Sequence, residues 1–217
     1  MKKTILLIIS IILMSSLFTA CASKEPKPPR ERDETFIADI SPFEVGTFHL
    51  YASFGYTKPK ICDFSVIFYP RSNTVYIKGR VGMDIIQVGF SQSERSSLAA
   101  AKDKYIEAYT SGTITNEKPT KKNAISTGKV PFYWGALGSG YQAEVTYLTN
   151  VEYILDNKPY FRIQFQATKG IGPDEQYSSP KTNIYISPSQ WETIVEACNQ
   201  ERLVEMTDEI LAEAQAF

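Results

Sequence analysis

Apolar and polar residues alternate along much of the chain, and a spacing of two predicts β-strands. In the first half, Phe64, Val66 and Phe68 fall on one face of such a strand, and the Pro-Arg-Ser-Asn segment that follows predicts the turn of a hairpin. Strands are expected at residues 45–56, 63–69, 74–81 and 84–90.

The spacing changes to a helical one after Phe90. Ser91 and Glu94 have the spacing of a capping box, in which the serine hydroxyl accepts from the third helical N–H and the glutamate reaches back to the cap. A helix is expected from there to about Thr110, followed by Ser111-Gly112 as its end. Its apolar stripe consists of Leu98, Ala101, Tyr105 and Tyr109.

The second half repeats this order of elements. Strands are expected at residues 131–134, 142–148, 151–155, 160–167 and 182–186. Ser187 and Gln190 form a second capping box with Pro188 at the favoured first helical position. One helix is expected to follow, with a stripe of Trp191, Ile194, Val195 and Cys198 that continues through Leu203, Met206, Ile210 and Ala214.

Each half therefore reads as strands followed by a helix, approximately ββββα, and the predicted fold is α+β. A single domain at 35–217 would contain two ββββα pseudo-repeats, about 45–112 and 127–205, with curved antiparallel sheets, two main helices and a helical extension at 206–217. This order resembles the repeats of PUR and Whirly-type proteins. The resemblance implies two halves that pack their helices against curved sheets.

The N-terminal segment has the pattern of an export signal. Lys2 and Lys3 precede residues 5–14, which are apolar apart from Ser10, and the segment ends at Cys21. This stretch of ten residues is shorter than the roughly 20 needed to span a bilayer, so removal of the segment is favoured over retention.

The end of this segment resembles the lipobox of bacterial lipoproteins, with Thr19 and Ala20 before Cys21 and Phe18 where a leucine is usual. The resemblance implies a signal peptide at 1–20, cleavage by signal peptidase II between Ala20 and Cys21, and a Cys21 that carries diacylglycerol and an acyl chain such as palmitate. A retained N-terminal anchor and simple secretion are the alternatives. The chain is also similar to uncharacterised spirochaetal lipoproteins.

Residues 21–34 are rich in proline and charge and are expected to form a tether between the lipid and the folded domain. The predicted location is the cell envelope, with the protein anchored to a membrane and either periplasmic or surface-exposed. Without residues 1–20 the chain has 21 basic and 24 acidic residues and a formal charge of −3. This charge does not favour nucleic acid as a partner.

Few residues suggest catalytic chemistry. His49 is the only histidine and is expected to be a half-exposed strand residue with one hydrogen bond, while Cys62 and Cys198 are expected to be buried unpaired thiols, with a disulfide as the alternative. No metal site, cofactor or catalytic residue is predicted. The possible carboxylate pairs are expected to be solvated caps and turns, and they involve Asp63, Asp84, Asp156, Asp174 and Glu175.

Two surfaces could bind partners. The last helix would present Met206, Ile210 and Phe217 to a protein partner or a second copy unless it folds back on the first half. The second surface combines basic residues with tyrosines, as PUR-type proteins do to hold single strands. It would contain Arg71, Lys78, Arg80, Lys118, Lys121, Lys122 and Lys129 with Tyr51, Tyr69 and Tyr76.

The sequence therefore predicts a membrane-anchored envelope lipoprotein with a non-catalytic binding or scaffolding role. The alternatives are a PUR-like single-stranded nucleic-acid binder and an enzyme of unrecognised type.

Overall fold

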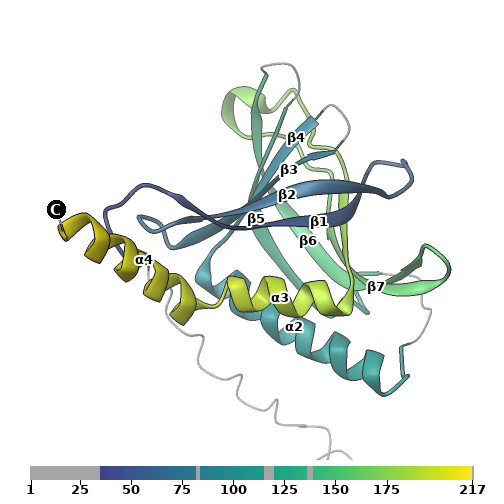
Figure 1. The fold of residues 1–217 in the computed structure, drawn as a ribbon. Helices are drawn as coiled ribbons and strands as arrows, with labels where there is room; N and C mark the ends of the chain where they lie inside the picture. Colours follow the sequence, from purple (N-terminus) through teal and green to yellow (C-terminus); the bar gives the residue numbers. More distant parts are fainter. Residues whose placement is uncertain (1–34, 82–83, 115–119, 136–138, 217) are drawn as a thin grey trace, which may run out of the picture. The chain divides into compact units, whose positions relative to one another are not determined.

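The computed structural model describes residues 35–81, 84–114, 120–135 and 139–216. Its elements follow the order of the chain (Figure 1). They are β1 (Phe43–Phe54), β2 (Lys60–Tyr69), β3 (Thr74–Val81), β4 (Asp84–Phe90), α2 (Gln92–Thr110), β5 (Ser126–Gly135), β6 (Tyr141–Ile154), β7 (Lys158–Phe165), the 3-10 helix η1 (Gly172–Asp174), β8 (Thr182–Ile186), α3 (Pro188–Ala197) and α4 (Gln200–Gln215).

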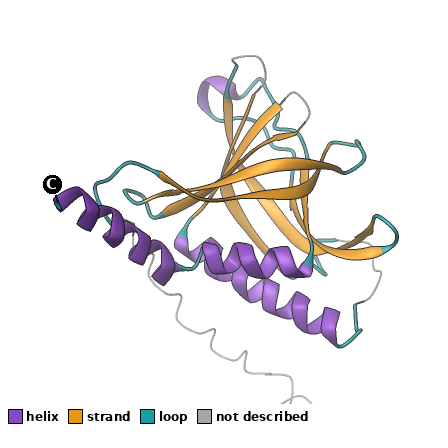
Figure 2. Ribbon diagram, viewed as in Figure 1, coloured by secondary structure: helices purple, strands orange, loops and turns teal. Residues whose placement is uncertain are grey.

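The eight described strands form one closed antiparallel barrel (Figure 2). Each strand pairs with the next in sequence, and β1 pairs with β8 through Tyr51–Tyr185, Ala52–Ile184, Ser53–Asn183 and Phe54–Thr182. The predicted α+β fold with two ββββα pseudo-repeats and curved antiparallel sheets is therefore wrong.

Two pairings join the halves that the sequence pattern had separated. β4 pairs with β5, where Ile85 lies opposite Gly135 and Val88 opposite Phe132, although α2 and its connection separate the two strands in sequence. The β1–β8 pairing then closes the sheet. Closure satisfies backbone groups that would otherwise remain exposed at sheet edges, which explains why one barrel forms instead of two open sheets.

The apolar face of the predicted hairpin lines the barrel interior. Phe64, Val66 and Phe68 are buried, and across the β2–β3 pair they lie opposite Gly79, Ile77 and Val75. A Cβ atom on Gly79 would lie 2.3 Å from Cδ1 of Phe64. Glycine at this position therefore makes room for the phenylalanine ring inside the barrel.

α2 and α3 both begin at one rim of the barrel. β4 and β8 run in the same direction because neighbouring strands are antiparallel, so the helices that follow them start at the same end. The two helices lie side by side there (Figure 1). The rings of Tyr105 from α2 and Trp191 from α3 both pack against Phe161, at centroid distances of 5.4 and 5.0 Å.

The helix starts follow the predicted caps. At α3, Ser187 N donates to Gln190 Oε1 at 3.1 Å, and Gln190 N donates to Ser187 Oγ, which confirms the capping box. At α2, Ser91 Oγ accepts from Glu94 N as predicted, but the Glu94 carboxylate accepts from the Ser91 hydroxyl. The local sequence thus fixes where each helix begins.

The prediction of two main helices is also wrong, because the C-terminal helix is interrupted. α3 ends at Ala197, and the side chain of Asn199 accepts from Glu201 N and Arg202 N to cap a new helix, α4. An asparagine that caps the backbone locally competes with continuation of the helix. Conversely, two strands were predicted at 142–148 and 151–155, where the structure has a single strand, β6.

Candidate functional site

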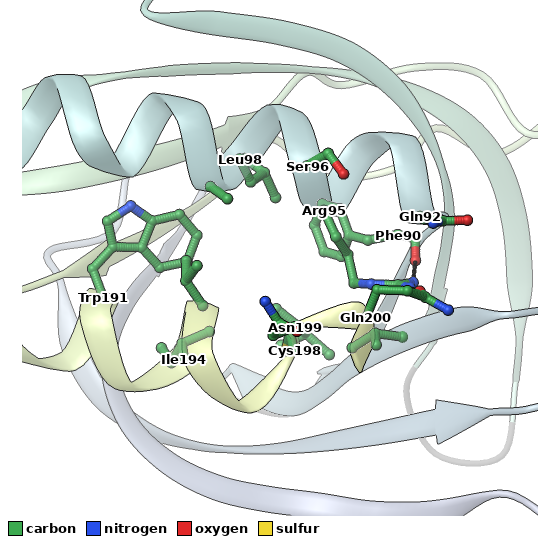
Figure 3. Close-up of a pocket in the computed structure, with 14 residues that line it drawn as sticks. Phe90, Gln92, Arg95, Ser96, Leu98, Trp191, Ile194, Cys198, Asn199 and Gln200 are labelled. Carbon is green, nitrogen blue, oxygen red and sulfur yellow. Dashed lines mark hydrogen bonds between the residues drawn. The ribbon is translucent and has the colours of Figure 1, made fainter. Parts of the chain in front are cut away.

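A half-open pocket of about 110 Å³ lies where α2, α3 and the start of α4 meet the barrel (Figure 3). Its walls are mainly apolar. They include Val75, Ile77 and Phe90 from the barrel and Leu98, Trp191 and Ile194 from the helices. All six side chains are buried parts of the core, so the pocket opens directly onto the packed interior.

The apolar end of the pocket is held by aromatic packing. Trp191 is only 2% exposed, and its indole ring stacks on Phe161 with an interplanar angle of 27°. Leu98 of α2 lies across the pocket from it (Figure 3). An indole ring held by this stacking gives a rigid wall for an apolar ligand.

Arg95 forms the polar end of the pocket. Its Nη1 donates to the carbonyl oxygens of Asn73 and Phe90 at 2.9 and 3.1 Å, and its Nη2 donates to Asn73 Oδ1 at 3.0 Å and Gln200 Oε1 at 2.5 Å. These bonds tie the β2–β3 turn, the end of β4 and the start of α4 to α2. Arg95 therefore holds the elements around the pocket in position.

Cys198 lines the same pocket as an unpaired thiol. Burial raises its pKa to about 12, and the nearby charge of Arg95 lowers it by a smaller amount. The thiol therefore stays protonated at neutral pH and is a poor nucleophile. Cys62 is also unpaired, which confirms the prediction of two free thiols; each is partly rather than fully buried.

The only histidine lies outside this pocket. The His49 side chain is 72% exposed, and its Nδ1 lies 2.6 Å from Asp63 Oδ1 across the β1–β2 pair. The predicted strand position and hydrogen bond are confirmed, with more exposure than predicted. Another candidate carboxylate, Asp174, accepts from Gln142 N through Oδ2 at 3.0 Å. Within the described ranges, no three His, Cys, Asp or Glu side chains come together as a metal site.

The predicted tyrosine and lysine surface is only partly assembled. Tyr69 and Tyr76 lie with ring centroids 4.7 Å apart, and Tyr133 extends this row at 6.4 Å from Tyr76. Tyr51 instead packs near Tyr160, at 5.9 Å. Lys78 and Arg80 are exposed on the strand that carries Tyr76, Arg71 pairs with Asp39, and Lys129 pairs with Glu144. Lys118 lies outside the described residues.

The remaining predicted site residues lie either on α4 or outside the residues that the structure describes. Met206 and Ile210 are half-buried on α4, beside the buried Leu203 and Thr207. Phe217, Ala20 and Cys21 lie outside the described residues. None of the described helices has the length and apolarity needed to cross a membrane.

The helical stripes predicted from the sequence include the apolar side of the pocket but not its polar end. Leu98, Trp191, Ile194 and Cys198 were all predicted on buried helical stripes, as the structure places them. Arg95 is not among the predicted site residues, although it lies three residues before Leu98 and so falls on the same face of α2. Helical spacing would have marked it as a buried cation.

Comparison with known proteins gives a spirochaetal family. No solved structure matches the chain. The chain is similar to a Treponema pallidum (strain Nichols) protein named "Uncharacterized protein", with 27% identity over 207 residues that cover 95% of this chain and 72% of that protein. The spirochaetal part of the expected resemblance is thereby confirmed. Because the model of the family described as "Uncharacterised Treponema protein" matches residues 17–205, the chain belongs to that family.

Proposed function

We propose that this chain is a membrane-anchored envelope lipoprotein that binds an apolar group in the pocket between its helices and barrel and has no catalytic role. The anchor in this proposal is the lipid on Cys21, which follows the apolar segment and Ala20. Each buried CH₂ of an acyl chain contributes about 0.8 kcal/mol to membrane binding, so a multiply acylated cysteine would hold the protein at the membrane.

The observation that carries the binding role is the half-open apolar pocket itself. Its volume of about 110 Å³ is smaller than the roughly 150 Å³ of an apolar cavity that accepts benzene, but one side is open. A group of a few carbon atoms could therefore enter and lie against Trp191 and Leu98. Such a group could be a small ligand or one apolar side chain of a partner.

The chemistry at the pocket supports binding over catalysis. The Cys198 thiol is protonated at neutral pH, and the terminal nitrogens of Arg95 donate to Asn73, Phe90 and Gln200. A protonated thiol does not provide a ready nucleophile, and an arginine engaged by the protein acts as a structural clamp. The apolar wall is then the part of the pocket that a ligand can use.

The proposal is tested by filling the pocket with a larger side chain on α2. Ala99 lines the pocket, whereas its neighbour Ala100 is exposed. Ala99→Leu therefore places a leucine side chain in the pocket, and Ala100→Leu places the same side chain outside it. With benzene as the probe, we expect shifts of the Trp191 indole NMR signal in the wild type and Ala100→Leu. Ala99→Leu should bind about tenfold more weakly, because leucine occupies the space.

The Trp134 indole, which does not line the pocket, is the internal control. Equal benzene affinity in all three proteins, at equal thermal stability, would contradict binding in this pocket.

A further inference from the structure

The turn between β1 and β2, residues 55–59, lies at the rim of the barrel opposite the start of the helices. This is the rim where β8 begins, because Phe54 at the end of β1 pairs with Thr182 at the start of β8. α3 follows the other end of β8, and α2 begins at that same rim. We propose that the β1–β2 rim contacts an anionic membrane surface. The inference rests on the membrane location proposed above and uses no residue of the pocket between the helices and the barrel.

Tyr56 stands at the tip of this turn. Its relative exposure is 107%, so the ring is about as accessible as in an unfolded chain. Around it, Thr57 N donates to the Phe54 carbonyl oxygen at 2.9 Å, and Gly55 N donates to the Lys181 carbonyl oxygen at 2.7 Å. These bonds hold the turn against β1 and the start of β8. The ring therefore projects into solvent from a hydrogen-bonded turn.

An isoleucine extends the apolar part of this rim. Ile61, next to Lys60 at the start of β2, is 61% exposed. Tyrosine is enriched at membrane–water interfaces, because its ring is apolar and its hydroxyl stays hydrated. Tyr56 and Ile61 can therefore enter the headgroup layer of a membrane without a change in the fold of the turn.

Three lysines surround these apolar side chains. Lys58 and Lys60 belong to the turn and the first residue of β2, Lys181 is bonded to the turn through its carbonyl oxygen, and all three are exposed. None of them takes part in an ion pair found in the described part of the chain. No acidic residue occurs within 45–62 or 176–186. The rim therefore presents positive charge that these segments do not neutralise.

The helical end carries the opposite charge. α3 and α4 contain one basic residue, Arg202, and seven acidic residues that are all exposed. The acidic residues are Glu192, Glu196, Glu201, Glu205, Asp208, Glu209 and Glu213. An anionic surface attracts the lysine rim and repels the helical end, so it orients the barrel with α3 and α4 away from the membrane. The pocket beside Trp191 then stays open to solvent.

The combination of charge and apolar side chains selects a membrane as the partner. Each lysine near an anionic membrane strengthens binding about fivefold, and this attraction falls off within about 10 Å at moderate salt. A dissolved polyanion would satisfy the lysines equally well. It offers no apolar layer for Tyr56 and Ile61, whereas a bilayer offers both.

The test uses residues 32–217, which form one compact unit with the closed barrel and its own core. This unit lacks Cys21, so its binding does not depend on a lipid anchor. Co-sedimentation is measured with vesicles of phosphatidylcholine and with vesicles in which about one third of the lipid is phosphatidylglycerol. We expect at least about tenfold stronger partitioning into the anionic vesicles, and loss of this difference at high ionic strength.

Two double variants test the position of the charge. Lys58→Gln combined with Lys60→Gln should weaken binding to the anionic vesicles at least about tenfold. Lys121→Gln combined with Lys122→Gln removes the same charge from exposed positions in the connection to β5, at the helical end, and should leave binding unchanged. Equal partitioning of the wild-type unit into both kinds of vesicle would overturn the proposal, as would equal losses in the two double variants.

Tyr56→Ser tests the ring without a change of charge. We expect it to weaken binding to the anionic vesicles about threefold. Tyr109→Ser, which removes a 46% exposed tyrosine from α2, should have no effect. If Tyr56→Ser bound as tightly as the wild type, or if dextran sulfate bound as tightly as the vesicles, the membrane contact would be wrong. Because the unit lacks Cys21, these results are separate from any failure of the anchoring proposal.

Discussion

Cys198 and Cys62 illustrate how burial sets reactivity at the scale of single residues. Burial raises the pKa of Cys198 from about 9 to about 12, while the pKa of Cys62 is raised by burial and the charge of Asp63. At pH 8 the Cys198 thiolate fraction should be about a thousandfold below that of an ordinary cysteine. We therefore expect iodoacetamide to modify Cys62 much faster than Cys198, as measured by peptide mass spectrometry. Equal rates in the folded protein would contradict this assignment, and equal rates after unfolding are the control.

Residue spacing allowed part of this site to be predicted. The helical stripe placed Cys198 and Trp191 on a buried face, and the structure confirms that face. The role of Arg95 could not be read in the same way, because its partners Asn73 and Gln200 lie 22 residues before and 105 residues after it. Only the folded barrel brings those acceptors to one guanidinium.

At the scale of elements, the α3 cap should contribute measurably to stability. Ser187 Oγ accepts from Gln190 N, and Gln190 also donates through Nε2 to the His49 carbonyl oxygen on β1 at 2.8 Å. Ser187→Ala should lower the free energy of unfolding by about 1 kcal/mol, the usual effect of losing a capping side chain. Ser189→Ala, two residues into the helix, is the matched control in urea unfolding. An equal loss in both variants would show that the cap is not the cause.

Elements specified by local chemistry were the most predictable. The bounds 74–81, 84–90 and 182–186 match β3, β4 and β8, and both helices begin at the predicted serines. The break between α3 and α4 was missed because the apolar spacing continues across Cys198 into Leu203. The capping geometry of Asn199 overrides that spacing.

At the scale of the whole molecule, closure decides the fold. Strand order within each half is local, but the β1–β8 and β4–β5 pairings depend on how the sheet curves as a whole. Alternation of apolar residues is the same in an open sheet and in a barrel, so two pseudo-repeats and one barrel have the same sequence pattern. The two-repeat interpretation failed for this reason, and with it the structural basis for a PUR-like platform.

The central proposal is that this barrel is held at a membrane through Cys21. The most direct measurement is metabolic labelling with palmitate in cells that produce the wild type or Cys21→Ser, followed by isolation of the protein and protease treatment of intact cells to locate it. We predict that the wild type takes up label and fractionates with membranes, and that Cys21→Ser takes up none. Label on Cys21→Ser, or an unlabelled wild type recovered from the cell interior with residues 1–20 still attached, would contradict the proposal.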